Sequence, residues 1–490
     1  MTRQQISLNP ATDEVVATFP VHTEDQVREI VAHARYASIW WKQQGFHGRR
    51  RALLNWKRYL AGHNAELVDL LHRENGKPRP DAGLELLLAI EHIDWNARHA
   101  GKVLRSRRRN PGLLLANFSA RVDHVAFGVV GVIGPWNYPI FTPNGSIATA
   151  LAAGNTVVFK PSEYTPAVAQ WYVNAFADAN PEAPTGILSL ITGDGETGAA
   201  LCRSGVDKIA FTGSAATGRK VMSACAEVMV PVVMELGGKD AAIVAADADI
   251  AAAADAIAFG AMGNSGQTCV GIERVYVERA VRDQFLDKLR GVLADVRPGT
   301  GIGASYGPMT MPSQIPVVRR HVEDAVASGG ETVIGDIGDI GERFIAPIVI
   351  LDPGHESAAI QEETFGPTLT VTTVTSLSEA VDLANDVRFG LGGAVFSRRR
   401  AREVVERLDT SQVSVNSVLG FAGMARLPLG GRGESGFGRI HGPEGLLEFT
   451  RTRAVATQRF PVPGVHLLSF RRAPWIDRLL PHLIRLLHAR

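Results

Sequence analysis

From Ala126 onward, short apolar runs alternate with longer segments of helical pattern, and this alternation restricts the fold more than any other feature. The apolar run Val129–Ile133 precedes a small-residue helical stretch, Asn144–Gly154, and a second apolar run follows at Thr156–Phe159. Strand–helix–strand units of this length form right-handed crossovers between parallel strands. We therefore expect an α/β protein with a parallel, Rossmann-like sheet, continued by the strands Gly186–Ile191 and Lys208–Thr212.

The alternation starts again after Val230–Leu236, which indicates a second α/β domain. No internal repeat links the two halves of the chain. The strands expected in the second half are Ala241–Val244, Arg274–Val277, Phe344–Leu351, Leu369–Thr373, Gly392–Phe396 and Gln412–Asn416. The helices expected between them are Asp249–Met262, Val281–Leu293, Ser376–Asn385 and Arg400–Leu408.

The first hundred residues read as a strand pair followed by helices. Ile6–Phe19 alternates around a turn signal, and Thr23 is a plausible N-cap for the first of several helices that continue to about Arg98. Tryptophans 40, 41, 56 and 95 fall in these helices, where core packing is the expected role. The basic run Arg105–Arg109 is expected to be a solvated turn, and Leu113–Val125 a projecting strand.

Composition excludes several classes of protein. With 490 residues, 45% of them apolar and 21% charged, the chain can build two or three domains of a globular enzyme. Its formal net charge of +1 argues against nucleic acid as a partner. Three cysteines make no disulfide framework, and we expect no secretory signal, no membrane span, no metal site and a cytoplasmic location.

One cysteine lies between glycines in the segment Gly266–Gly271. A cysteine becomes a nucleophile when it loses its proton, and little side-chain bulk shields Cys269 in this loop. The loop alone leaves a catalytic and a structural role open. Cys202 and Cys225 fall within apolar helical patterns, so we expect both to be buried structural thiols.

Two polar residues upstream could serve this cysteine. Glu235 ends an apolar strand before two glycines, where partial burial would raise the pKa of its carboxyl toward that of a general base. An ion pair with Lys239 is the alternative. Asn137 could form an oxyanion hole with the backbone N–H of Cys269, although an Asn-Tyr-Pro segment is often only a turn.

A nucleotide site is suggested by two strand ends. Phe211–Gly218 reads as a strand, a glycine turn and a helix start, which offers donors to a phosphate but lacks the GxGxxG pattern. Lys160 and Glu163 follow an earlier strand, where a ribose would lie at the carboxyl edge of a parallel sheet. A carboxylate there favours free ribose hydroxyls over a 2′-phosphate.

Taken together, these segments resemble the aldehyde dehydrogenase superfamily, and the resemblance covers roughly Ile6 to Thr457. The motifs that carry it are Gly134–Pro139, Lys160–Glu163, Phe211–Ser214, Glu235–Lys239, Gly266–Cys269, Glu362–Pro367 and Gly430–Gly436.

The resemblance implies an NAD-dependent enzyme, with NADP possible. Its catalytic residues would be Cys269 as nucleophile, Asn137 in the oxyanion hole and Glu235 as the base that hydrolyses a thioacyl intermediate. The residues implied in cofactor binding are Trp136, Lys160, Ser162, Glu163, Gly213, Ser214, Gly218, Leu236, Glu363 and Phe365. The presence of Glu235 argues against release of the acyl group to CoA, and the intact set argues against a non-catalytic scaffold.

The resemblance also implies a domain plan and a homo-oligomer, either a dimer or a tetramer. Residues 1–110 and 127–236 would form the NAD(P)-binding domain, and residues 237–428 the catalytic domain. Residues 111–126 and 429–457 would form a β-ribbon oligomerisation arm.

Two departures from the family pattern bear on function. A Lys/Glu pair that is thought to relay protons in the classical branch is replaced by Ser146 and Ile440, so Glu235 needs another proton route. The sequence is closest to the class 3 and bacterial semialdehyde branches, yet it lacks the arginine that grips a distal carboxylate. The expected channel residues are Phe141, Leu419, Phe421 and Leu429, with Gly145 leaving room, which favours an apolar, long-chain or aromatic aldehyde.

The resemblance ends near Thr457, and an amphipathic tail (458–490) follows. Ile476, Leu479, Leu480, Leu483, Ile484 and Leu487 share one helical face, and Pro481 is expected to produce a kink or two short helices. Either the segment 474–490 lies on an anionic membrane with Trp475 at the interface, or the apolar stripe packs on the enzyme or on a second copy.

Overall fold

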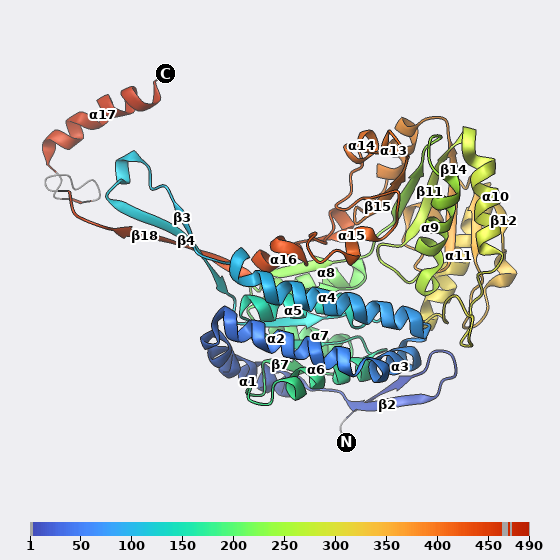
Figure 1. Ribbon diagram of the computed structural model, residues 1–490, viewed down its shortest axis with the longest axis horizontal. Coiled ribbons are helices and arrows are strands. Elements are labelled where there is room, and N and C mark those ends of the chain that lie inside the picture. Colours follow the sequence, from blue (N-terminus) through green and yellow to red (C-terminus); the bar gives the residue numbers. More distant parts are fainter. Residues whose placement is uncertain (1–2, 463–468, 471–472, 490) are drawn as a thin grey trace. The chain divides into compact units, whose positions relative to one another are not determined.

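The computed structural model describes residues 3–462, 469–470 and 473–489, and it divides into two compact units. Unit 1 comprises residues 1–103 and 126–450, and unit 2 comprises residues 104–125 and 451–490. Figure 1 shows the elements of both units.

The first sheet of unit 1 is the expected Rossmann-like sheet. Its strand order is β17-β9-β8-β5-β6-β7, and every neighbouring pair among β9 to β7 is parallel. The strands are β5 (Val129–Ile133), β6 (Thr156–Lys160), β7 (Leu188–Leu190), β8 (Lys208–Thr212), β9 (Val232–Glu235) and β17 (Gly436–Phe437). The helices that accompany them are α1 (Glu24–Gln43), α5 (Phe141–Ala153), α6 (Pro166–Ala179), α7 (Gly195–Arg203) and α8 (Ala215–Ala226).

The second sheet of unit 1 has seven strands and is also mainly parallel. Its order is β12-β13-β14-β11-β10-β15-β16, and only β12 runs antiparallel to its neighbour. The strands are β10 (Asp240–Val244), β11 (Ile272–Glu278), β12 (Glu331–Ile334), β13 (Ile348–Leu351), β14 (Thr368–Val374), β15 (Gly393–Phe396) and β16 (Ser414–Val415). The accompanying helices include α9 (Ile250–Met262), α10 (Arg282–Leu293), α11 (Ile315–Ala327), α13 (Leu377–Asn385) and α14 (Ala401–Val405), several of them visible around this sheet in Figure 1.

Each sheet has its own apolar core. In the first, Val129, Val158 and Ile209 pack with helix residues such as Val31. In the second, Val275 and Val371 pack against the small residues of α9 and against Phe285 of α10. Because both faces of these parallel strands are covered by helices, the strands read as continuous apolar runs.

The amino-terminal region follows the expected pattern. Strands β1 (Gln4–Leu8) and β2 (Val15–Pro20) pair antiparallel, and Thr23 caps α1 in a capping box with Gln26. Helices α2 (Gly45–Gly62), α3 (Asn64–Asn75) and α4 (Arg79–Val103) follow. Trp41, Trp56 and Trp95 are buried as expected, whereas Trp40 is half-buried.

Unit 2 contains a three-stranded sheet of order β18-β4-β3. Strands β3 (Arg107–Arg109) and β4 (Phe118–Ala126) pair antiparallel, and β18 (Thr450–Gln458) lies beside β4. The expected solvated turn at Arg105–Arg109 is therefore wrong in part, since Arg107–Arg109 form an exposed strand. The unit ends in α17 (Pro474–His488), one helix with Pro481 inside it, so the alternative of two short helices is wrong.

The boundaries of the arm also differ from the expected ones. Residues 104–110 belong to unit 2, because β3 pairs with β4. Residues 429–450 belong to unit 1, because β17 pairs with the end of β9 and α16 (Gly442–Glu448) packs on α4 and α5. None of the helices in the described part of the chain is both long and apolar enough to span a bilayer.

Candidate active site

The loop that carries Cys269 has an unusual backbone. After α9 ends, Asn264, Ser265 and Gly266 all adopt positive φ angles, of 54°, 59° and 69°. A side chain at Gly266 would collide with the carbonyl oxygen of Gly366, so glycine is required there on two counts. Such conformations cost free energy and are found at functional sites. They reverse the chain just before Cys269, which precedes the amino end of β11.

The predicted catalytic residues meet at one cavity. Cys269, Glu235 and Asn137 all line a cavity of about 130 Å³, which we call the central cavity. Cys269 and Glu235 also line a larger apolar cavity of about 270 Å³. The sequence places these three residues far apart, and the structure brings them together between the two sheets of unit 1.

The positions follow from the topology of the first sheet. Asn137 lies beyond the carboxyl end of β5, and Glu235 is the last residue of β9. The carboxyl ends of parallel strands meet at one edge of a sheet, which is where α/β proteins bind ligands. The loop with Cys269 approaches this edge from the second sheet.

Asn137 is held tightly from both of its ends. The side-chain Nδ2 of Asn137 donates to the backbone carbonyl of Gln267 at 2.9 Å. The backbone carbonyl oxygen of Asn137 accepts from Lys77 Nζ at 2.9 Å and from Asn264 Nδ2 at 3.1 Å. The amide group has two N–H bonds, so one remains for a ligand oxygen in the central cavity. Asn137 is 4% exposed.

Glu235 is buried without a hydrogen-bond partner for its Oε1 atom. It is 4% exposed, and burial raises the pKa of its carboxyl well above the usual value, a shift that Arg439 opposes and Glu448 reinforces. The alternative of an ion pair with Lys239 is wrong, because Lys239 pairs with Glu273 and donates to Thr364. A carboxylate with a raised pKa accepts a proton more readily than an exposed one, and this property suits a general base beside a thiol.

The thiol of Cys269 is also shifted. Burial raises its pKa to about 12, and the carboxylates of Glu363, Asp240 and Glu235 add to the shift. The thiol therefore needs a base or a nearby positive charge to become a thiolate. Cys202 and Cys225 are buried in the core of the first sheet, as expected for structural thiols.

A third cavity, of about 380 Å³, lies along the carboxyl edge of the first sheet, and we call it the strand-edge cavity. Residues expected to bind a cofactor form much of its lining: Trp136, Lys160, Ser162, Glu163, Gly213 and Ser214. Lys160 is buried and donates to the carbonyl of Pro161 at 2.9 Å, whereas Glu163 is exposed. Ser214 caps the amino end of α8, where backbone N–H groups are available to phosphate oxygens. The donor set suits a nucleotide.

Glu363 and Phe365 join the central cavity from the second sheet. Glu363 accepts a hydrogen bond from the backbone N–H of Gly238 at 3.1 Å, and burial raises the pKa of its carboxyl to about 8. Phe365 adopts a positive φ of 52° and contacts the ring of Trp136 edge-on, with 5.6 Å between centroids.

Two further residues were expected to bind the cofactor, and only one of them lines a cavity described above. Leu236 lines the central and the apolar cavities. Gly218 is not among the lining residues of the strand-edge cavity; a side chain there would meet Leu236 within 2.7 Å. A packing contact between α8 and the end of β9 accounts for a glycine at this position.

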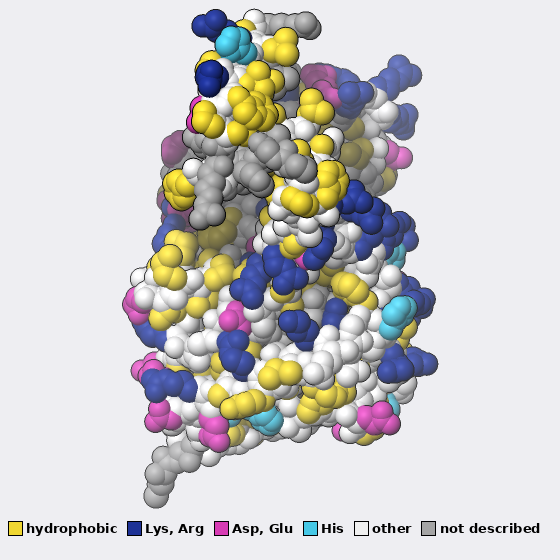
Figure 2. Space-filling model, turned by 90° about the vertical axis from the view of Figure 1, so that its left-hand side faces the viewer, with side chains coloured by type: hydrophobic (Ala, Val, Ile, Leu, Met, Phe, Trp, Pro, Cys, Tyr) yellow, Lys and Arg dark blue, Asp and Glu magenta, His cyan; other side chains and the backbone are white. Residues whose placement is uncertain are grey.

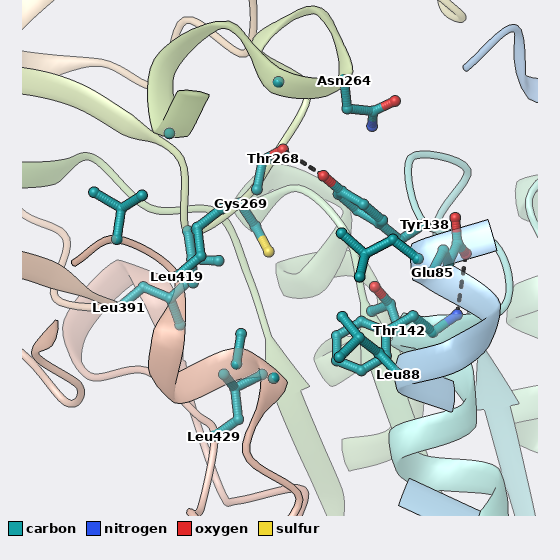
Figure 3. Close-up of a pocket in the computed structure, with 18 of the residues that line it drawn as sticks. Glu85, Leu88, Tyr138, Thr142, Asn264, Thr268, Cys269, Leu391, Leu419 and Leu429 are labelled. Carbon is teal, nitrogen blue, oxygen red and sulfur yellow. Dashed lines mark hydrogen bonds between the residues drawn. The ribbon is translucent and has the colours of Figure 1, made fainter. Parts of the chain in front are cut away.

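The apolar cavity contains three of the four expected channel residues: Phe141, Leu419 and Leu429. Figure 3 shows the sulfur of Cys269 directed into the space between Tyr138, Leu88 and Leu419. The fourth, Phe421, is not among the lining residues. It is buried, and its ring lies where a side chain at Gly392 would be. The expectation that Gly145 leaves room for substrate is also wrong, because His441 and Ile440 fill that space.

Sequence reasoning missed several residues of this cavity. Helix α4 contributes Leu84 and Leu88, and His441 comes from the turn before α16. Lys77 and Glu85 also line the cavity, and they form a fully buried ion pair with each other. Glu85 Oε1 also accepts from the backbone N–H groups of Ile140 and Phe141, at 2.8 and 3.1 Å. Lys77 and Glu85 are eight residues apart, and this spacing does not indicate from sequence that they pair or that Glu85 binds the turn after β5.

Comparisons with known proteins cover nearly the whole chain. The model of the aldehyde dehydrogenase family matches residues 2–455. The chain is 35% identical to 4,4′-diapolycopene aldehyde oxidase of a Methylomonas species over 461 residues, 93% of this chain and 86% of that protein. It is 33% identical to a Mycobacterium ulcerans protein assigned as a succinate-semialdehyde dehydrogenase (NADP(+)), over 91% of this chain and 87% of that one. The crystal structure of an NAD-dependent aldehyde dehydrogenase from Sinorhizobium meliloti is similar with a TM-score of 0.89 and 31% identity, covering 94% of this chain and 93% of that chain.

Proposed function

The chain belongs to the aldehyde dehydrogenase family, and on that premise we propose that it oxidises an apolar aldehyde to a carboxylic acid through a thioester on Cys269. The cofactor of this oxidation is NAD or NADP. The observation that carries the proposal is the convergence of Cys269, Glu235 and Asn137 on the central cavity.

The reaction begins when the thiolate of Cys269 attacks the carbonyl carbon of the aldehyde. The carbonyl oxygen becomes an oxyanion, which accepts hydrogen bonds from Asn137 Nδ2 and from the backbone N–H of Cys269. NAD or NADP, when bound, supplies the acceptor for the hydride that leaves this carbon. Cys269 then carries a thioester, and Glu235 removes a proton from the water that hydrolyses it.

The cofactor would extend from the strand-edge cavity into the central cavity. Lys160 and Glu163 would hold the hydroxyl groups of the adenine ribose, and Ser214 would meet the pyrophosphate at the amino end of α8. Glu363 and Phe365 would position the ribose and ring of the nicotinamide beside Cys269. The exposed carboxylate of Glu163 favours NAD, since it would repel a 2′-phosphate.

Two features support an apolar substrate. The residues around Cys269 in the apolar cavity include Leu88, Phe141 and Leu419. A distal carboxylate, as in a semialdehyde, would need a free cation. Of the described residues that line this cavity, the one lysine or arginine is Lys77, which is buried and paired with Glu85.

A turnover assay with a panel of aldehydes tests the proposal. We expect NAD(P)H formation without added CoA. The Cys269→Ala variant should form none, and the Glu235→Gln variant should give a burst of one NAD(P)H per site followed by turnover at least about 100-fold slower. Cys225→Ala serves as a matched control, because that thiol lies in the core of the first sheet.

Four outcomes would contradict the proposal. A strict need for CoA would indicate transfer of the acyl group to CoA, and absence of turnover with every aldehyde would favour a non-catalytic role. A full steady-state rate in Glu235→Gln would remove Glu235 from the hydrolytic step. A preference for semialdehydes over alkanals of equal length would replace the apolar substrate by a semialdehyde.

We also propose how the enzyme assembles and where it acts. The ribbon formed by β3, β4 and β18 has the strand edges through which a homo-oligomer could form, as a dimer or a tetramer. The amphipathic tail (458–490) would in addition bring this cytoplasmic enzyme to an anionic lipid surface. Residues 459–490 contain six arginines against one aspartate, and α17 exposes Trp475, Leu479 and Ile484.

A further inference from the structure

His441 is a buried histidine with no assigned task. It is 1% exposed, it lines the apolar cavity, and neither of its ring nitrogens has a hydrogen-bond partner among the described residues. Buried polar side chains nearly always have partners, and each exception needs an explanation. A polar atom in a ligand would provide one.

The backbone at His441 is held in a conformation that glycine adopts far more readily. Its φ and ψ angles are 62° and 165°, a region that residues with a Cβ atom rarely occupy. The preceding residue, Ile440, is fixed by a bridge to Leu429, and α16 begins at the following residue, Gly442. Histidine therefore occupies a position where glycine would fit with less strain, which argues that the imidazole itself is needed.

The surroundings of His441 fix its ring and leave it uncharged. The ring contacts His92 edge-on, with 4.1 Å between centroids, and Phe141 at 5.7 Å. Gly145 allows this placement, since a side chain there would come within 2.6 Å of Nε2. Burial lowers the pKa of His441 well below its usual value, and His92 adds to the shift. A neutral imidazole has one donor and one acceptor nitrogen.

Several polar side chains of the cavity wall already have partners. The hydroxyl groups of Tyr138 and Thr268 bond to each other at 2.9 Å, Lys77 pairs with Glu85, and Asn264 donates to the carbonyl of Asn137. The two nitrogens of His441, like Oε1 of Glu235, have no hydrogen-bond partner among the described residues, and the rest of the wall is largely apolar.

We propose that His441 binds an uncharged oxygen, as a hydroxyl or carbonyl group, on the chain of the aldehyde that enters the apolar cavity. The inference rests on the proposed function and narrows its substrate class from any apolar aldehyde to one with a single polar group along the chain. A neutral imidazole selects such a group over a carboxylate, because it provides no positive charge to offset the charge of the carboxylate. It also rejects the analogue that lacks the oxygen, because the buried nitrogens would then stay unpaired.

The first experiment compares matched aldehydes. A series of straight-chain alkanals of one length, each with a hydroxyl group on a different carbon, is assayed by NAD(P)H formation against the unsubstituted alkanal. We expect kcat/KM to rise at one position of the hydroxyl group by roughly tenfold or more relative to the unsubstituted compound. Equal values at every position would overturn the proposal.

Variants then assign the preference to His441. His441→Gly removes the imidazole and suits the backbone angles, so the ratio of kcat/KM for the preferred hydroxyalkanal to kcat/KM for the unsubstituted alkanal should fall to about one. Gly145→Ala keeps the ring but displaces it, and it should reduce the preference in the same way. His92→Leu is the matched control, because His92 contacts His441 without lining the cavity, and it should retain the preference.

The readouts separate failure of this inference from failure of the proposed function. If no aldehyde yields NAD(P)H with the wild-type enzyme, the proposed function fails. If alkanals are oxidised and the preference persists in both His441→Gly and Gly145→Ala, the assignment to His441 is wrong. Thermal unfolding of each variant shows whether it is folded, and should His441→Gly not fold, Gly145→Ala decides alone.

Discussion

Burial controls the chemistry of individual residues at this site. Three acids, Glu235, Asp240 and Glu363, lie close enough to raise the pKa of Cys269, and burial raises the pKa of each of these carboxyls in turn. A thiol in such surroundings is mostly protonated near neutral pH, so the proposed mechanism requires a base or a positive charge near Cys269. The arrangement protects the nucleophile from unwanted reactions, since the thiolate is the reactive form.

The raised pKa of Glu235 predicts a pH dependence for the hydrolysis of the thioester. Below its pKa the carboxyl carries a proton and cannot accept another from water, so the hydrolysis rate should fall roughly tenfold for each unit of pH below that value. Because burial raises this pKa well above its usual value, the fall should begin at a higher pH than it would for an exposed glutamate. The measurement uses a p-nitrophenyl ester to acylate Cys269 without a redox step, followed by the steady-state release of acid from pH 5 to 9.

Two controls make that profile specific. Glu235→Gln should give a slow rate with no such rise, because its amide does not titrate in this range. The burst of p-nitrophenol, which reports attack by Cys269, is followed separately in every sample. A wild-type hydrolysis rate that is independent of pH between 5 and 8 would contradict the role of Glu235.

Some of the residues of this site could be predicted from sequence and others could not. Cys269, Glu235 and Asn137 lie in short motifs at strand ends, so resemblance and strand position both identified them. His441 and the pair Lys77–Glu85 lie in segments without such motifs. Their importance comes from burial and from contacts between residues distant in the chain, which local patterns do not encode.

At the scale of elements, the turn after β5 depends on α4. The pair Lys77–Glu85 connects the start of α4 to this turn: Lys77 donates to the carbonyl of Asn137, and Glu85 accepts from the N–H groups of Ile140 and Phe141. The ring of Tyr138 lies 4.2 Å from Lys77 Nζ. Lys77, just before α4, and Glu85 within it therefore hold the Asn137 side of the proposed oxyanion hole and one wall of the apolar cavity.

Breaking this pair should cost both stability and activity. Glu85→Gln keeps an oxygen for the two backbone donors but leaves the buried ammonium of Lys77 unpaired, and Lys77→Met leaves the carboxylate unpaired. Removing one partner of a buried pair costs about 3–5 kcal/mol, so urea-induced unfolding should show losses of that order. Turnover should fall as well, because Asn137 loses a contact that holds its turn.

An exposed ion pair supplies the control. Arg402 and Glu406 pair on the surface of unit 1, with both side chains more than half exposed, so Glu406→Gln should change the free energy of unfolding by less than about 1 kcal/mol. If Glu85→Gln were as mild as Glu406→Gln, the pair would not be the support that its burial indicates.

The prediction of elements succeeded where periodicity was strong. Val129–Ile133 and Lys208–Thr212 are strands with the expected bounds, because strands buried on both faces leave uninterrupted apolar runs. Helix α11 and strand β12 were missed in the long interval between residues 294 and 343. Strand β17 has two residues, and its pairing with Glu235 depends on a partner about 200 positions earlier in the chain, so no local pattern could reveal it.

At the scale of the whole molecule, unit 1 explains the chemistry without the tail. The family model ends at residue 455, and the cavities around Cys269 are lined by residues of unit 1 alone. Helix α17 lies beyond the part of the chain that the family model matches, so its role needs a separate proposal. Figure 2 shows hydrophobic side chains gathered along this terminal segment, with arginine and histidine beside them.

The amphipathic character of α17 predicts binding to anionic membranes. Trp475, Leu479 and Ile484 are exposed on the apolar side, and Arg478 and Arg485 lie on the opposite side, where they can meet lipid phosphates. The full-length protein should therefore sediment with phosphatidylglycerol vesicles and stay in the supernatant with phosphatidylcholine vesicles. A chain truncated after Phe460 should stay in the supernatant with both and retain its turnover.

Salt and paired substitutions separate this prediction from self-association through the same helix. Arg478→Gln with Arg485→Gln should weaken binding to anionic vesicles, and added salt should weaken binding of the wild type, since about 1 kcal/mol per basic residue comes from charge near the surface. Leu479→Gln with Ile484→Gln should abolish it by removing the apolar contact. If the apolar side instead packs on a second copy, truncation lowers the molar mass measured by light scattering, and vesicles of either composition leave the protein in the supernatant. That result would contradict the lipid assignment, because a face already covered by protein has no apolar surface left for the bilayer.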